Sequence, residues 1–203
     1  MFHYKFTKEK VYFTGCEHIS HKNICRGSSA WSDIDKTRDF DTLEEMNLAI
    51  IQSFKVINPT DHLFILGDII FGDKSKLGSF LKQINTYNIY YIYGNHCDWL
   101  RKDAVAQSYF KWVGDYLEIV INKKLLILSH YPFAVWRESH KGSYMLHSHS
   151  HGSYKPGLPN SEDSKILDIG WDVFHRPIEF TEITQIMYKK GFKQSDHHNK
   201  NTT

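Results

Sequence analysis

Side chains that bind metal ions occur in five short clusters along this chain of 203 residues. In order, the clusters are Cys16-Glu17-His18, Gly67-Asp68, Gly94-Asn95-His96, Ser129-His130 and His149-Ser150-His151. Imidazole nitrogen, carboxylate oxygen and amide oxygen are ligands that proteins offer to divalent cations, and some of them bridge two ions. Six such donors, with the thiol of Cys16 as a seventh, are enough for two ions. The clusters therefore predict a site for two divalent metals.

Each cluster follows a segment that is predicted to be a strand or a hairpin. Runs of apolar, β-branched and aromatic residues end just before the first four clusters, at residues 11–14, 63–66, 89–93 and 125–128. In open α/β sheets, ligand sites lie beyond the carboxyl ends of the strands. Clusters that are far apart in the sequence can therefore meet in one crevice.

Helical patterns lie between these strands. Apolar residues recur at every third or fourth position from Leu43 to Ile57, which is one stripe of a helix. Thr42 and Glu45 form a capping-box pattern at its start, and Asn58-Pro59 ends it, because proline disfavours helical geometry in the preceding residue. Residues 77–84, 104–113 and 180–190 are also predicted to be helical.

The rest of the chain predicts a hairpin, a loop and a last strand. Residues 117–121 and 125–128 flank Asn122-Lys123 and have the pattern of a β-hairpin. Residues 142–157 form a loop rich in serine, histidine and glycine, and residues 166–169 a strand. The alternation of strands and helices predicts an α/β fold with a mainly parallel sheet.

Composition favours one compact, soluble domain. The formal charge of +2 comes from dispersed lysines and arginines, so nothing calls for nucleic acid as a partner. No stretch approaches the roughly 20 apolar residues that cross a bilayer, and three cysteines are a poor basis for a disulfide framework. We expect a cytoplasmic protein without membrane contacts, with one domain over residues 1–192 and a polar tail over residues 193–203.

In the order of its clusters, the chain resembles the calcineurin-like metallophosphoesterases, particularly their small single-domain bacterial and phage members. The family pattern is Asp-x-His, Gly-Asp, Gly-Asn-His-Asp/Glu, His and Gly-His-x-His. Here it reads Cys16-Glu17-His18, Gly67-Asp68, Gly94-Asn95-His96-Cys97, His130 and Ser148-His149-Ser150-His151. His21-Lys22-Asn23-Ile24 and Glu45-Met46-Asn47 also resemble this subgroup. The resemblance covers about residues 10 to 185.

The resemblance implies a four-layer α/β/β/α sandwich and two divalent ions, either manganese, zinc or iron. One ion would be held by Cys16, His18 and His151, and the other by Asn95, His130 and His149, with Asp68 bridging them. A hydroxide that bridges the ions would attack phosphorus, and His96 would protonate the leaving alkoxide. Further candidates for contacts to the ligands or the substrate are His21, Asp98, Arg101 and Arg137, and, among the remaining arginines, Arg26 and Arg38.

Two cysteines depart from the family pattern. Cys16 stands where the family has aspartate, and it could bind a softer ion such as zinc or ferrous iron, stay uninvolved, or be an engineered change that lowers activity. The neighbouring Glu17 should face the opposite way from Cys16 at the end of an extended strand. Cys97 replaces the carboxylate after His96, so that Asp98 is the candidate for orienting His96.

These observations predict a phosphoesterase that acts on small phosphomonoesters or phosphodiesters, with nucleotide-like diesters favoured. Nothing beyond the core domain is left to build a long nucleic-acid groove, which argues against the alternative of a nuclease from the same family. A second alternative is a metal-impaired protein that binds phosphate or nucleotide, because Cys16 replaces the family's aspartate. The specific substrate, the native metal and the oligomeric state stay open.

Overall fold

The computed structural model describes residues 2–4, 9–154 and 164–191. Its strands are β1 (Phe2–Tyr4), β2 (Val11–Thr14), β3 (His62–Leu66), β4 (Ile89–Ile92), β5 (Trp112–Gly114), β6 (Tyr116–Ile121), β7 (Lys124–Ser129), β8 (Tyr144–His147), β9 (Ile166–Asp168) and β10 (Ile178–Glu179). Its α-helices are α1 (Leu43–Ser53), α2 (Leu77–Leu81), α3 (Asp98–Arg101), α4 (Ala104–Gln107), α5 (Trp171–Phe174) and α6 (Phe180–Lys189). Short 3-10 turns complete the described part.

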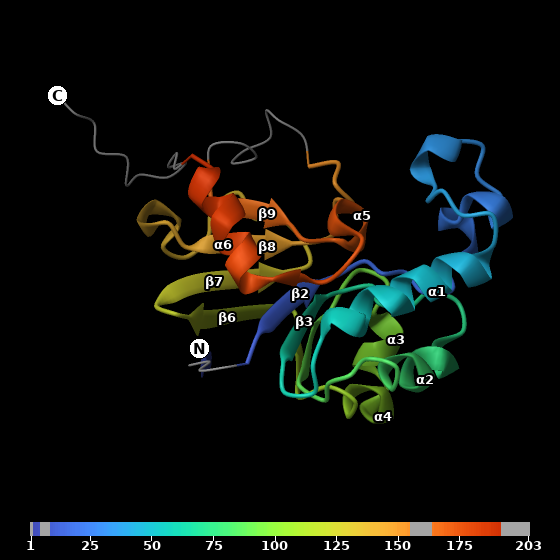
Figure 1. The fold of residues 1–203 in the computed structure, drawn as a ribbon, viewed down its shortest axis with the longest axis horizontal. Helices are drawn as coiled ribbons and strands as arrows, with labels where there is room; N and C mark the ends of the chain where they lie inside the picture. Colours follow the sequence, from blue (N-terminus) through green and yellow to red (C-terminus); the bar gives the residue numbers. More distant parts are fainter. Residues whose placement is uncertain (1, 5–8, 155–163, 192–203) are drawn as a thin grey trace.

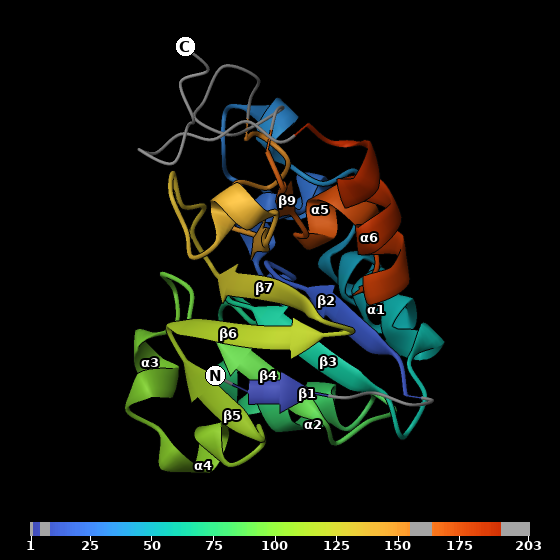
Figure 2. The same ribbon diagram turned by 90° about the vertical axis from the view of Figure 1, so that its left-hand side faces the viewer.

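The strands form two five-stranded sheets. The first sheet has the order β10-β2-β3-β4-β5, in which β2 to β5 are parallel and β10 is antiparallel to β2. The second has the order β1-β6-β7-β8-β9, in which only β6 and β7 are antiparallel. The parallel arrangement predicted for the first sheet is therefore confirmed. Figure 2 shows the second sheet, with β6 and β7, in front of β2, β3 and β4.

The predicted hairpin is confirmed as β6 and β7. Asn122 and Lys123 form its turn, and both have positive φ, 49° and 66°. Two central residues of positive φ make the turn whose twist matches that of the flanking strands. The hairpin places His130 directly after the carboxyl end of β7, the central strand of the second sheet.

Apolar side chains fill the space between the two sheets and a second space behind the first sheet. Along β3, Phe64 and Leu66 point toward the second sheet, whereas Leu63 and Ile65 point toward helices α1 to α4. Both faces of the first sheet are thus buried, which is why its strands read as continuous apolar runs. Figure 1 shows α1 to α4 covering this sheet.

Helix α1 begins as predicted. The Thr42 side chain accepts a hydrogen bond from the backbone N–H of Glu45, and the Glu45 carboxylate accepts one from the backbone N–H of Thr42. Met46 and Ile50 of the predicted stripe are fully buried, and Phe54 continues the stripe in a 3-10 turn. Through these residues, α1 packs against the first sheet.

The second sheet is covered differently on its outer face. Leu125, Ile127, Met145 and Ile166 pack there against Trp136, from the segment that follows β7. Helix α6 instead contributes to the core between the sheets, through residues Phe180, Ile183 and Met187. The predicted α/β class is confirmed by two mixed sheets with helices.

Two sequence-based predictions about local structure are wrong in part. Only α4 is an α-helix within residues 104–113, because Trp112 and Val113 belong to β5 and pair with Tyr90 and Tyr91. The predicted loop over residues 142–157 contains β8, whose residues pair with both β7 and β9. Tertiary pairing outweighs local composition at both places.

The remaining predictions concern the last strand and helix, membrane-spanning helices and the tail. The predicted last strand and last helix are present as β9 and α6, whereas the sequence patterns do not predict β1, β10, α3 and α5. Within the described residues, no helix has the length and apolar character needed to cross a bilayer. The predicted polar tail over residues 193–203 lies outside the described residues.

Candidate metal centre

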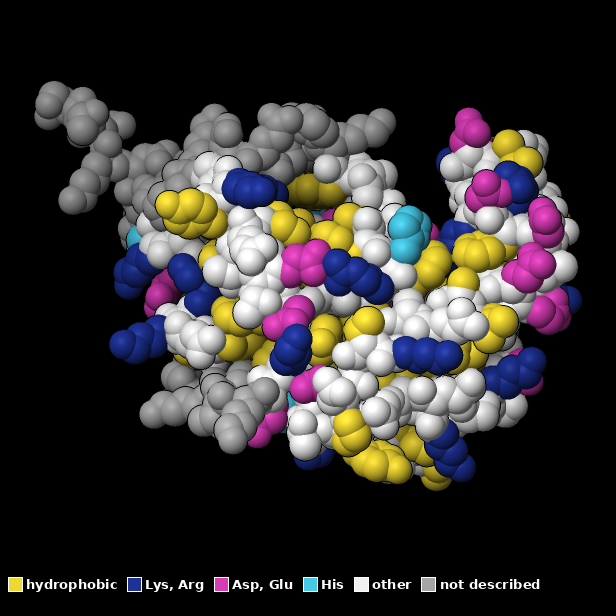
Figure 3. Space-filling view, in the orientation of Figure 1, with side chains coloured by type: hydrophobic (Ala, Val, Ile, Leu, Met, Phe, Trp, Pro, Cys, Tyr) yellow, Lys and Arg dark blue, Asp and Glu magenta, His cyan; other side chains and the backbone are white. Residues whose placement is uncertain are grey.

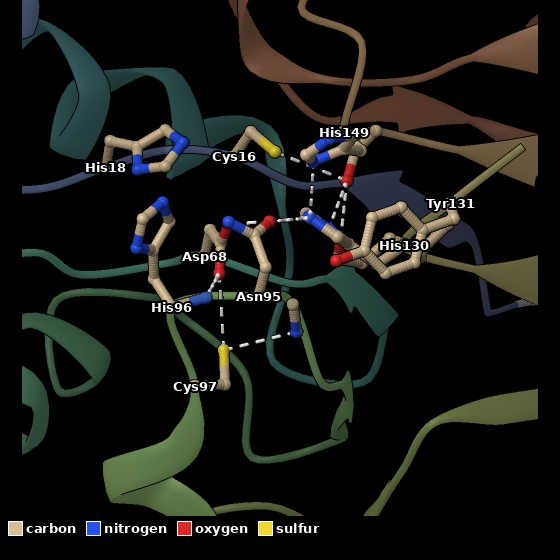
Figure 4. A network of polar contacts seen from close by, with 12 residues as sticks. Cys16, His18, Asp68, Asn95, His96, Cys97, His130, Tyr131 and His149 are labelled. Carbon is tan, nitrogen blue, oxygen red and sulfur yellow. Dashed lines mark hydrogen bonds and ion pairs between the residues drawn. The ribbon is translucent and has the colours of Figure 1, made fainter.

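The predicted donors converge at the carboxyl ends of the strands. Figure 4 shows side chains from separate segments pointing toward one another, with Cys16, Asp68 and Asn95 between His18 and His130. Two groups of donors have all their ligand atoms within 4.8 Å of one another: Cys16, His18 and His151 form the first, and Cys16, Asp68 and His130 the second. The loops after β2, β3, β7 and β8 supply these residues.

In the first group, two imidazole rings face each other through ring nitrogens. Nε2 of His18 lies 3.3 Å from Nε2 of His151, and Nδ1 of His151 donates to the carboxylate of Asp172 at 2.5 Å. Nε2 of a neutral His151 is therefore an acceptor. Burial lowers the pKa of His18 well below its ordinary value. The 3.3 Å separation suits two nitrogens bound to one ion at about 2.0–2.1 Å each.

In the second group, two oxygen atoms and one nitrogen atom face one ring nitrogen of His130. Nδ1 of His130 lies 2.8 Å from the carbonyl oxygen of Leu66, which only accepts, so Nδ1 carries the hydrogen. Nε2 then lies 2.8 Å from Oδ1 of Asn95, 3.1 Å from Nδ1 of His149 and 3.4 Å from Oδ2 of Asp68. Burial lowers the pKa of His130, although Asp68 opposes the shift. A neutral ring that directs its lone pair at two oxygens fits a cation between them.

Four of the candidate ligands have left-handed backbone conformations. The φ angles are 54° for Cys16, 52° for His18, 52° for Asp68 and 48° for His151. Such conformations cost roughly 1–3 kcal/mol each in residues other than glycine, and they cluster at functional sites. The fold therefore gives up stability to direct these side chains.

Two glycines leave room for the donors. Gly67 has φ of 94°, and a Cβ atom there would lie 2.5 Å from Nδ1 of His130. A Cβ atom on Gly94 would collide with the carboxylate of Asp68. Any larger residue at either position would displace a donor.

An ion pair between the buried Arg38 and the partly buried Asp172 supports the first donor group. The guanidinium of Arg38 donates to Oδ1 of Asp172 at 2.6 Å and to the carbonyl oxygens of Glu17 and Cys16 at 2.6 and 2.8 Å. Burial alone would raise the pKa of Asp172, but the hydrogen bond from His151 and the charge of Arg38 outweigh it and hold that pKa well below its ordinary value. Asp172 thus orients His151, as carboxylates commonly orient metal-binding histidines.

Sequence reasoning misses this pair. Arg38 is only one of several arginine candidates for phosphate, and Asp172 is not among the predicted residues. Asp172 lies 21 residues after His151, in the one-turn helix α5, where a single aspartate forms no pattern. Only the tertiary contact identifies it.

Glu17 follows Cys16, and Asp98 follows Cys97, the two cysteines that depart from the family pattern. Both carboxylates lie outside the two donor groups. Oε1 of Glu17 accepts a hydrogen bond from the Thr14 hydroxyl at 2.6 Å, and burial raises the pKa of Glu17 to about 7. Asp98 is exposed, and its carboxylate lies 4.0 Å from Nε of Arg101. Neither carboxylate is among the described donors around Cys16 and Asp68.

The remaining predicted residues surround the centre or lie away from it. His96 is exposed, and its ring centroid lies 6.0 Å from that of His18 and 5.0 Å from that of Phe71. His21 stacks on Phe71, with 3.9 Å between the ring centroids. Arg101 pairs with Asp115, and Arg137 pairs with Glu118. Both arginines are therefore engaged away from the two donor groups.

Comparison with known proteins is informative only about the fold. No family model and no curated protein matches this chain. A solved structure, described as the protein of unknown function AQ665 from Aquifex aeolicus, matches with a TM-score of 0.65 and 21% sequence identity. The match covers 88% of this chain and 100% of that chain. The chain therefore shares its overall fold with a protein that is described without an activity.

Proposed function

We propose that this chain is a metal-dependent phosphoesterase of the calcineurin-like type, acting on small phosphomonoesters or phosphodiesters, with nucleotide-like diesters favoured. The observation that carries the proposal is that metal-binding side chains from separate segments form two neighbouring sets. Cys16, His18 and His151 lie together, and Asn95 and His149 contact His130 beside Asp68. These are the two sets that the family resemblance assigns to two ions.

The donor chemistry fits two divalent cations, either manganese, zinc or iron. Cys16, His18 and His151 would hold one, and Asn95, His130 and His149 the other, with Asp68 between them. When bound, the ions would supply positive charge for the phosphate oxygens and an activated water for attack on phosphorus.

His96 is our candidate for the residue that moves a proton. Its backbone N–H donates to Oδ1 of Asp68 at 3.0 Å, which fixes the residue beside the donors. Its side chain is exposed, so a bound ester can reach it. We assign to it the protonation of the leaving alkoxide.

A cavity beside the centre supports a small substrate. It has a volume of about 420 Å³, and its lining includes His21 and Phe71, the second of which also contacts His96. Lys22 and Lys76 lie in the lining together with the acidic residues Glu44 and Asp73. This volume is in the range of pockets for small molecules. Figure 3 shows lysine and arginine mixed with acidic side chains on the visible face, which favours a small ester over a long nucleic acid.

The proposal includes the family's four-layer sandwich. Helices α1 to α4, the first sheet and the second sheet supply three successive layers. We propose that the segment with Trp136, which packs on the outer face of the second sheet, takes the place of the fourth layer.

Metal analysis and turnover test this proposal. The purified chain should bind close to two equivalents of manganese, zinc or iron and should hydrolyse an aryl phosphodiester. Asp68→Asn and His130→Ala should lose most activity, by about 100-fold or more, whereas His140→Ala, outside both donor groups, should keep it. At most one equivalent of metal and no turnover would overturn the proposal. Retained nucleotide binding in that case would indicate a phosphate-binding protein, and cleavage of plasmid DNA in preference to small esters would indicate a nuclease.

A further inference from the structure

We infer that the sulfur of Cys16 is a ligand shared by both metal positions, so that the centre selects thiophilic cations, such as zinc, cobalt or ferrous iron, over manganese. The inference rests on the proposed metal centre. Its basis is that Sγ of Cys16 belongs to both donor groups, within 4.8 Å of His18 and His151 and within 4.8 Å of Asp68 and His130. In Figure 4 the sulfur lies between His18 and His130.

The surroundings of Cys16 differ from those of the other two cysteines. All three are buried, but Cys25 and Cys97 belong to the apolar cluster behind the first sheet, whereas Cys16 belongs to none of the apolar clusters among the described residues. A cysteine that served only as a small apolar side chain would pack among apolar neighbours. Cys16 is buried among metal-binding groups instead.

A second buried donor points to the same place. His18 is 4% exposed, and its Nε2 atom faces Nε2 of His151 on the side of Cys16. Nδ1 of His151 donates to Asp172, which leaves Nε2 of His151 as the ring nitrogen that can bind a cation. Two ring nitrogens and the sulfur of Cys16 therefore surround one position.

Hydrogen bonds hold the backbone of Cys16 in a conformation that residues other than glycine rarely adopt. Its φ of 54° is left-handed, yet its N–H donates to the carbonyl oxygen of Gly67 at 2.9 Å and its carbonyl oxygen accepts from Arg38 at 2.8 Å. Two anchors on one residue keep the strained conformation in place. The result is that Sγ lies where the two donor groups meet.

The proton of the thiol has a defined place before a metal binds. The hydroxyl of Ser148 donates to the carbonyl oxygen of Leu66, so it accepts from the thiol of Cys16 at 3.5 Å. Binding of a cation would replace the S–H bond with a bond from sulfur to the cation, and the proton would pass to solvent. The single negative charge of the thiolate would then take the place of a carboxylate, but with a softer donor atom.

Reconstitution with cobalt tests the inference independently of activity. The metal-free chain, Cys16→Ser, Cys16→Asp and the matched control Cys25→Ser would each be titrated with Co²⁺, with circular dichroism as the check of folding. We expect sulfur-to-cobalt charge-transfer absorption in the near ultraviolet for the unmodified chain and for Cys25→Ser, and none for either Cys16 variant. In competition, Cys16→Asp should shift the preference for zinc over manganese toward manganese by at least about 10-fold.

The outcomes separate the inference from the proposed function. Two bound equivalents with turnover but without the charge-transfer band would overturn the role of Cys16 and leave the phosphoesterase intact. A band that persists in a folded Cys16 variant would assign the sulfur ligand to another cysteine and overturn the inference as well. No bound metal and no turnover in the unmodified chain would overturn the proposed function, and the inference with it.

Discussion

The thiol of Cys97 lies 3.4 Å from Oδ1 of Asp68. The same oxygen accepts the backbone N–H of His96 at 3.0 Å, whereas Oδ2 faces His130. Burial raises the pKa of Cys97 to about 11, so the thiol keeps its proton at neutral pH. Where the calcineurin-like family has a carboxylate, this chain has a side chain that holds Asp68.

Replacement of Cys97 should weaken metal binding. Cys97→Ala removes the donor to Oδ1 and leaves the N–H of Gly94, which lies 3.2 Å from the sulfur, without its partner. We expect metal affinity to fall by about 10-fold to 100-fold, as is usual when a group that orients a ligand is lost. Cys97→Ser, which retains a donor, should lose less. Isothermal titration would measure both, and equal losses in the two variants would contradict the orienting role.

His96 should matter most for poor leaving groups. In His96→Asn we expect kcat to fall by about 100-fold to 10,000-fold for an alkyl phosphodiester, because its alkoxide needs a proton. The loss for a nitrophenyl ester should be much smaller, since that leaving group is stable as an anion. Metal content should be unchanged, because His96 belongs to neither donor group. Equal losses with both esters would count against a proton donor.

The ion pair of Arg38 and Asp172 should contribute strongly to stability. Their side chains are 6% and 18% exposed, so Asp172→Asn leaves a buried guanidinium without its counter-charge. We expect the free energy of unfolding to fall by about 3–5 kcal/mol. Asp115→Asn is the matched control, since Asp115 is 67% exposed beside Arg101, and it should cost at most about 1 kcal/mol. Urea denaturation of the metal-free proteins would compare them, and similar losses would refute the difference.

A buried histidine should be replaceable by an apolar residue. His147 is fully buried, and neither of its ring nitrogens has a partner among the described residues. Burial of an unpaired polar group costs roughly 1–3 kcal/mol, so His147→Leu should leave the free energy of unfolding unchanged or raise it. Thermal unfolding at neutral pH would measure this. A loss above about 2 kcal/mol would reveal a polar partner for the imidazole.

Much of the fold follows from local patterns. The capping box at Thr42 and Glu45, the apolar stripe through Met46 and Ile50, and the turn at Asn122-Lys123 depend on neighbours close in the sequence, and the structure contains all three. Strand β5 is not predicted, because Trp112 and Val113 become a strand only when they pair with β4. Pairing partners distant in sequence leave no local periodicity to detect.

The sequence by itself determined the types of donor and the strand ends that carry them, from Cys16 in the first cluster to His151 in the last. Only the tertiary structure decided that Cys16 lies in both donor groups, that Cys97 holds Asp68, and that Asp172 and Arg38 support His151. The physical reason is that residue types follow from the chain, whereas side-chain directions follow from backbone conformations and contacts between segments far apart in it. Four left-handed residues at the centre show how strongly those contacts override local preference.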